Sequence, residues 1–83
     1  MPYEVIWSPR VLDDLEKLEK GLRKRIVRKV CDLSFSPYHF AERLVDAKAW
    51  RLRVGDYRVI LDIQENPKQI HVLKVGHRKE VYK

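Results

Sequence analysis

The strongest constraint on the fold is a two-residue period on both sides of Gly55-Asp56: Trp50, Leu52 and Val54 alternate with Arg51 and Arg53 before it, and Tyr57, Val59, Leu61 and Ile63 recur at every second position after it. A two-residue glycine-containing step between two such runs is typical of a β-hairpin. With Gly55 and Asp56 as the turn, the expected pairs are Val54 with Tyr57, Arg53 with Arg58, Leu52 with Val59, Arg51 with Ile60, and Trp50 with Leu61. Because direct partners share a face, the apolar side chains fall on one side of the hairpin and Arg51, Arg53 and Arg58 on the other.

This second side, which we call the arginine face (Arg51, Arg53 and Arg58), is not what folding alone would select. Arg53 opposite Arg58 places like charges across a strand pair, which is destabilising. Ile60, the expected partner of Arg51, also lies on this face, and alternation along a last strand over residues 70–75 adds Val72 and Lys74, with Arg78 if the chain stays extended beyond Gly76. A surface that mixes dense positive charge with apolar side chains is typical of one that binds a partner. The alternative is a solvated sheet face with extended arginine stems.

The rest of the chain predicts a small α+β domain. Residues 3–7 alternate as a strand, and Ser8-Pro9 is typical of a helix start. Leucines at helical spacing continue to a break at Gly21, and a basic second helix with an apolar stripe ends at Ser36-Pro37. Residues 34–49 are expected to form a loop or a short helical turn, and Asn66-Pro67 a chain reversal. We therefore expect one domain over residues 1–83, in the order β-α-α-β-β-β, with an antiparallel sheet and a helical hairpin packed on one face.

Composition narrows the function. The 83 residues carry a net charge of +6 (18 basic, 12 acidic), which favours a polyphosphate partner. The single cysteine, Cys31, excludes an internal disulfide framework, and three scattered histidines predict no metal site, so no metal or cofactor is expected. No leader pattern and no run of roughly 20 apolar residues is present, so we expect a cytoplasmic protein without membrane contact.

The segment Trp50-Arg51-Leu52-Arg53-Val54-Gly55-Asp56-Tyr57-Arg58-Val59-Ile60, followed by Val75-Gly76-His77-Arg78-Lys79-Glu80-Val81-Tyr82, resembles the RelE/ParE toxin superfamily. The resemblance implies a microbial-ribonuclease-like α+β fold. It also implies a type II toxin that enters the ribosomal A site and cuts mRNA there, with 16S rRNA contacts through the basic second helix. An acidic RelB-like antitoxin would wrap and inhibit the toxin, giving a toxin-antitoxin hetero-oligomer.

The resemblance also implies site residues. Basic residues before the hairpin turn, an arginine after it, an arginine after the Val-Gly step and a tyrosine near the end correspond here to Arg51, Arg53, Arg58, Arg78 and Tyr82. The first two are lysines in the best studied ribosome-dependent nucleases, which leaves the activity of this chain open. Metal-independent cleavage by the 2′-hydroxyl requires loss of the 2′-proton, stabilisation of the phosphorane charge and protonation of the 5′-oxygen.

Arginine, with a pKa above about 12, suits phosphate binding better than proton abstraction. We therefore assign Arg51, Arg53 and Arg58 to phosphate binding and transition-state charge, with Arg58 also counted as catalytic. Arg78 is assigned as leaving-group stabiliser or acid. Tyr82 is expected to stack on a base, and the general base stays open.

Two further residues are placed in the substrate-binding set. Lys74 follows from the strand alternation, and His77 has an unperturbed pKa suited to a general base. Alternation from Val75 nevertheless points His77 away from Arg78, and a plain surface histidine is the alternative. Two other functions stay open for the whole chain: a ParE-like toxin that binds DNA gyrase without nuclease chemistry, and a plain basic nucleic-acid-binding module.

Overall fold

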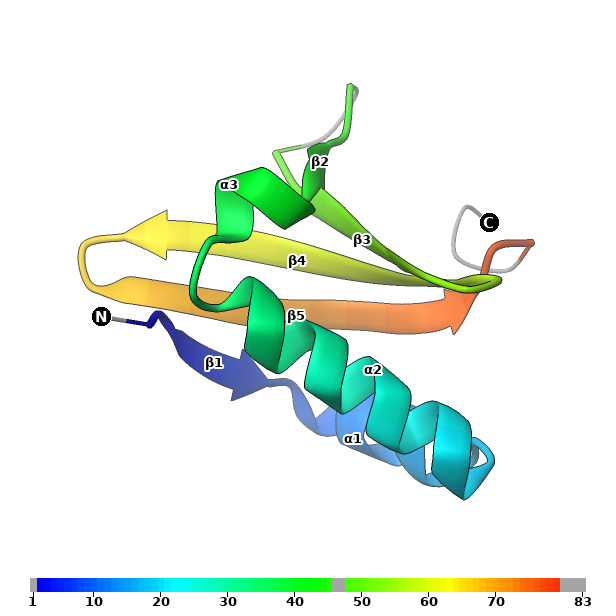
Figure 1. The fold of residues 1–83 in the computed structure, drawn as a ribbon. Helices are drawn as coiled ribbons and strands as arrows, with labels where there is room; N and C mark the ends of the chain where they lie inside the picture. The colour runs from blue at the N-terminus through cyan, green and yellow to red at the C-terminus, as the bar shows by residue number, and fades with distance from the viewer. Residues whose placement is uncertain (1, 46–47, 80–83) are drawn as a thin grey trace.

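The predicted hairpin forms the middle of a five-stranded sheet (Figure 1). The computed structural model describes residues 2–45 and 48–79. Its elements are β1 (Glu4–Trp7), α1 (Pro9–Glu16), α2 (Lys20–Leu33), α3 (Pro37–Phe40), β2 (Glu42–Arg43), β3 (Trp50–Val54), β4 (Tyr57–Glu65) and β5 (Lys68–His77). The strand order is β1-β5-β4-β3-β2, with β1 parallel to β5 and the other neighbours antiparallel. The predicted α+β class is confirmed.

The register predicted for the hairpin is confirmed at all five pairs, from Val54 with Tyr57 to Trp50 with Leu61. Gly55 has φ +59°, a left-handed conformation that glycine adopts at little cost, so the sequence position of the turn follows from this residue. Leu52, Val54, Val59 and Leu61 are buried on the helix side of the sheet. The hairpin therefore supplies the sheet side of the hydrophobic core.

Helices α1 and α2 pack on one side of the sheet (Figure 1). Helix α1 packs mainly against β5 and buries Val11 and Leu15, and α2 packs against β3 and buries Ile26, Val30 and Leu33. Ser8 caps α1 as predicted, because its Oγ accepts a hydrogen bond from the Val11 amide at 3.3 Å. Within residues 2–45 and 48–79, no helix is long and apolar enough to cross a membrane.

The predicted helix break at Gly21 is wrong by a few residues. The chain leaves α1 after Glu16, and α2 already begins at Lys20. The side chain of Glu19 accepts a hydrogen bond from the Gly21 amide at 2.9 Å, which caps α2 one residue before its start. Gly21 thus lies in the first turn of α2, where a side-chain cap compensates for its poor helix propensity.

The prediction that Val72 shares the arginine face is also wrong. Ile60 pairs with Lys74 but Leu61 pairs with Val72, so β5 contains one extra residue, Leu73, relative to β4. Such a bulge reverses the side-chain alternation along the bulged strand. Val72 is consequently fully buried in the core, whereas Leu73 is 45% exposed.

The segment expected as a loop or short turn contains α3 and an unpredicted edge strand. Strand β2 pairs Glu42 with Arg51 and Arg43 with Trp50, and thus extends the sheet beyond β3. Helix α3 places the Tyr38 ring edge-on to Trp50, with centroids 5.1 Å apart. This segment therefore covers the end of the hairpin farthest from the Gly55 turn.

Glu65 ties this end of the molecule together. Its carboxylate accepts hydrogen bonds from the hydroxyl groups of Tyr38 and Tyr3, the latter at 2.8 and 2.9 Å. The hydrogen bond from Tyr38, and to a smaller extent that from Tyr3, lowers the pKa of Glu65. The hydrogen bond between Tyr38 and Glu65 also raises the pKa of Tyr38 to about 12. One carboxylate of β4 thus connects α3 with the residue that precedes β1.

Candidate functional site

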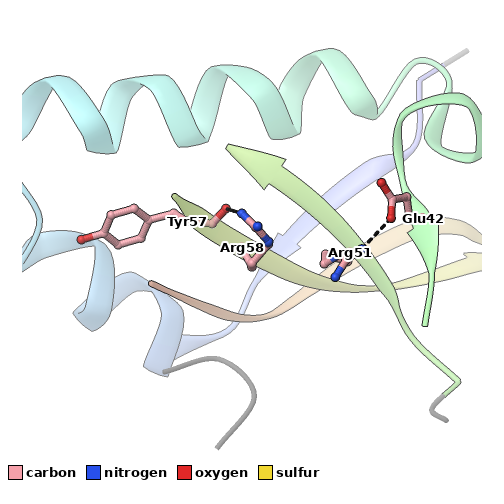
Figure 2. Close-up of polar contacts among 4 residues, drawn as sticks. All are labelled: Glu42, Arg51, Tyr57 and Arg58. Atoms are coloured by element: carbon pink, nitrogen blue, oxygen red, sulfur yellow. Dashed lines mark hydrogen bonds and ion pairs between the residues drawn. The ribbon is translucent and has the colours of Figure 1, made fainter. Parts of the chain in front are cut away.

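The three arginines of the predicted face differ in exposure. Arg53 is exposed and Arg51 is partly covered, but Arg58 retains only 8% of its accessible surface. Its Nη1 donates to the backbone carbonyl of Gly55 at 3.2 Å. It also donates to the Tyr57 carbonyl at 3.1 Å (Figure 2). Its buried Nε has no hydrogen-bond partner among the described residues. Arg58 is therefore the most covered of the three arginines, because its side chain folds back onto its own turn.

The Gly55 turn brings together basic residues from three separate elements. Arg58 bonds to it from β4, and the Arg78 backbone amide donates to the Asp56 carbonyl at 2.8 Å just beyond β5. From α2, Arg25 reaches the same turn: its Nη1 lies 3.7 Å from the position that a Cβ on Gly55 would occupy. Arg25 was missed as a site residue, because the period of α2 alone does not indicate which cation faces the turn.

Glu42 is the acidic residue that the sequence analysis missed. Its Oε2 lies 2.6 Å from Arg51 Nη2, in a hydrogen-bonded ion pair across the β2–β3 edge (Figure 2). The Arg51 hydrogen bond and charge lower the pKa of Glu42, and the charges of Arg53 and Arg58 lower it further. A carboxylate therefore lies within the field of all three arginines. Glu42 lies in the segment of residues 34–49, for which the sequence predicted no strand, so its pairing with Arg51 could not be expected.

Lys74 and His77 lie at a different part of the surface. Lys74 pairs with Ile60, as expected for the arginine face, but it lines a hollow of about 370 Å³ between α1 and the end of β5. His77 lines the same hollow, and its ring packs edge-on against Tyr57 at 5.6 Å. The structure does not bring His77 to the arginines, in agreement with the expected alternation. Tyr82 lies outside the described residues.

A flanking hollow on the other side of the hairpin includes Arg53. It measures about 350 Å³ and is bounded by α2, α3 and the β2–β3 edge, with Phe40 and Leu52 as apolar lining and Lys29 as a further cation. Over residues 2–45 and 48–79, no group of three His, Cys, Asp or Glu side chains is placed to hold a metal ion.

A helical hairpin on a largely antiparallel sheet is the fold that this chain shares with RelE/ParE-like toxins. A family model described as the ParE toxin of type II toxin-antitoxin systems, parDE, matches residues 5–82. The chain belongs to this family, and the resemblance noted in the sequence is confirmed.

Solved structures agree with this assignment. The RelBE2 toxin-antitoxin complex from Mycobacterium tuberculosis is 28% identical, with a TM-score of 0.83 over 94% of this chain and 100% of that chain. The archaeal RelE–RelB complex from Pyrococcus horikoshii OT3 is 29% identical, with a TM-score of 0.81 over 96% of this chain and 99% of that chain.

A mutant of the Escherichia coli toxin RelE in the free state shares the fold, with a TM-score of 0.79, 22% identity, and coverage of 99% of this chain and 92% of that chain. A search of curated protein sequences returned no significant match.

Proposed function

We propose that this toxin is a ribosome-dependent mRNA endoribonuclease that stops translation by cutting messages in the ribosomal A site. The observation that carries the proposal is the position of three arginines around one hairpin turn: Arg53 and Arg58 are direct partners beside Gly55, and the backbone amide of Arg78 donates to the Asp56 carbonyl of the same turn. Guanidinium groups bind phosphates through paired N–H donors and stay charged throughout the reaction. Several arginines around one turn would stabilise the concentrated negative charge of a phosphorane. A general attraction for polyanions would not require the arginines to lie so close together.

In this proposal the residues divide the work of binding and catalysis. Arg51, Arg53 and Arg58 hold the RNA phosphates, and Arg58 and Arg78 stabilise the charge that grows as the 2′-oxygen attacks. Arg78, exposed beyond the end of β5, protonates or stabilises the leaving 5′-oxygen. Tyr82 stacks on a base of the displaced codon. Lys74 and His77 contact RNA away from the scissile phosphate, because they line the hollow beside α1.

A second candidate is supported by the family model itself, whose description is of ParE. In that case the arginines would form a binding surface for DNA gyrase and would catalyse no cleavage. The two functions differ in a measurable product, because only the nuclease leaves a new 5′ end in a translated message.

The deciding experiment is inducible expression followed by primer extension on a translated message, with a gyrase supercoiling assay on the purified toxin in parallel. We expect codon-aligned cleavage by the wild type and about 100-fold slower single-turnover cleavage on programmed ribosomes for Arg78→Ala, by analogy with the loss of one transition-state donor. Lys48→Ala, which removes the same charge from an exposed position between β2 and β3, is the matched control. Inhibited supercoiling without any cleavage would assign the chain to the gyrase-binding toxins.

We further propose that the partner is an acidic, RelB-like antitoxin that forms a hetero-oligomer with this toxin. The M. tuberculosis and P. horikoshii structures are toxin-antitoxin complexes, which supports a partner of this kind. On the ribosome, the basic outer side of α2, with Arg23, Lys24 and Arg28 around an exposed Val27, would contact 16S rRNA. Co-expression with the adjacent reading frame, followed by purification, tests the antitoxin directly.

A further inference from the structure

An acidic residue occupies the surface to which we assign RNA phosphate. Strand β2 is only two residues long, and its register places Glu42 directly opposite Arg51. The contact is short, at 2.6 Å, yet the Glu42 side chain is 63% exposed and the Arg51 side chain 23% exposed. The carboxylate therefore covers a cation that is itself held in place by the sheet.

The surroundings of Glu42 are those of an anion-binding site. The charges of Arg53 and Arg58, in addition to that of Arg51, keep its pKa low, so Glu42 is ionised at neutral pH. Arg58 is more than nine-tenths buried and has one N–H without a partner among the described residues. Carboxylate and phosphate present similar pairs of oxygens to a guanidinium, so an anion of either kind fits here.

We propose that Glu42 is an internal competing anion: a phosphodiester binds the arginine face by displacing the Glu42 carboxylate from Arg51, so that Glu42 sets the affinity of the toxin for RNA. This inference rests on the proposed function for the identity of the ligand. It goes beyond that function in assigning an opposing role to a residue of β2.

Displacement is feasible because little structure depends on the ion pair. Exposed ion pairs contribute little stability, since water solvates both partners almost as well. A two-residue edge strand that loses one side-chain contact keeps its backbone pairing with β3. A phosphate then takes the place of the carboxylate beside Arg51 Nη2.

The test compares Glu42→Gln with Glu16→Gln, which removes the same charge from an exposed position on α1. The probe is a short, fluorescently labelled DNA strand, which lacks the 2′-hydroxyl and is not cleaved. We expect Glu42→Gln to bind about threefold to fivefold more tightly than the wild type, the range that the strength of an exposed ion pair allows. Glu16→Gln should bind like the wild type.

Two results would overturn the inference. One is equal or weaker binding by Glu42→Gln, also seen with Glu42→Ala, which removes the acceptor altogether. The other is the same gain in an Arg51→Ala background, because the effect would then not pass through Arg51. Failure of the proposed nuclease function gives a different result. If Glu42→Gln binds the probe more tightly but the toxin cuts no message, this inference stands and the nuclease function is refuted.

Discussion

Replacing Arg58 by methionine separates the part of this residue that serves folding from the part that serves function. Methionine keeps an unbranched apolar stem and removes the guanidinium. The change removes two hydrogen bonds to the carbonyls of Gly55 and Tyr57, each contributing about 1 kcal/mol to stability.

Two unfavourable contributions disappear with the same substitution. The like charges of Arg53 and Arg58, which are direct partners across the hairpin, cost a few tenths to about 1 kcal/mol. The buried Nε–H of Arg58, which has no partner among the described residues, costs about 1 kcal/mol or more. The free energy of unfolding should therefore change by less than about 1 kcal/mol in either direction, and the midpoint by less than about 8 °C.

The assay is urea and thermal unfolding followed by circular dichroism, with Leu61→Ala as the control. Leu61 is fully buried, and its truncation should cost about 2–5 kcal/mol. Arg58→Met should instead lower affinity for the DNA probe about tenfold, the loss expected for a hydrogen bond to a charged group. A destabilisation as large as that of Leu61→Ala, or an unchanged probe affinity, would refute the assignment of Arg58 to phosphate binding.

Three further predictions address the bulge, the Glu65 cluster and the chain end. Val72→Ala should cost about 2 kcal/mol and Leu73→Ala about 0.5 kcal/mol in urea unfolding, and equal costs would contradict the bulge in β5. Glu65→Gln should lower the unfolding midpoint at neutral pH. Because hydrogen bonds from Tyr38 and Tyr3 lower the folded-state pKa of Glu65 below its ordinary 4.5, this contribution is present above that value and is lost as pH falls through the folded pKa. A midpoint difference from wild type that persists in strong acid would rule out this cause. For a stacking role, Tyr82→Phe should retain most cleavage on programmed ribosomes and Tyr82→Ala should lose about tenfold, whereas equal damage would indicate that the hydroxyl transfers a proton.

The sequence could predict the hairpin because its information is local. A glycine at the turn and period-two alternation on both sides define the register without reference to any other element, and the pairing of Arg53 with Arg58 follows directly. The cap at Ser8 is equally local, since it involves residues three positions apart. The α+β class then follows from the need to bury one apolar face under two amphipathic helices.

The sequence could also predict which arginines share one face of the hairpin. It could not predict how deeply each of them is buried. Alternation places Arg58 on that face, whereas its burial depends on how the guanidinium folds over the Gly55 turn. The extra residue in β5 is invisible in the sequence, because Leu73 and Val72 are both apolar and either would satisfy the pattern. Only the pairing with β4 decides which of them is buried.

What the sequence determined by itself is therefore the set of cations that the hairpin presents, since strand periodicity fixes the side on which each residue lies. Tertiary structure alone decided what stands beside them. Glu42 reaches Arg51 through an edge strand of two residues, and Arg25 reaches the Gly55 turn from a different element. Such contacts join residues that no common period relates, so they form only when the sheet edge and α2 are packed around the hairpin.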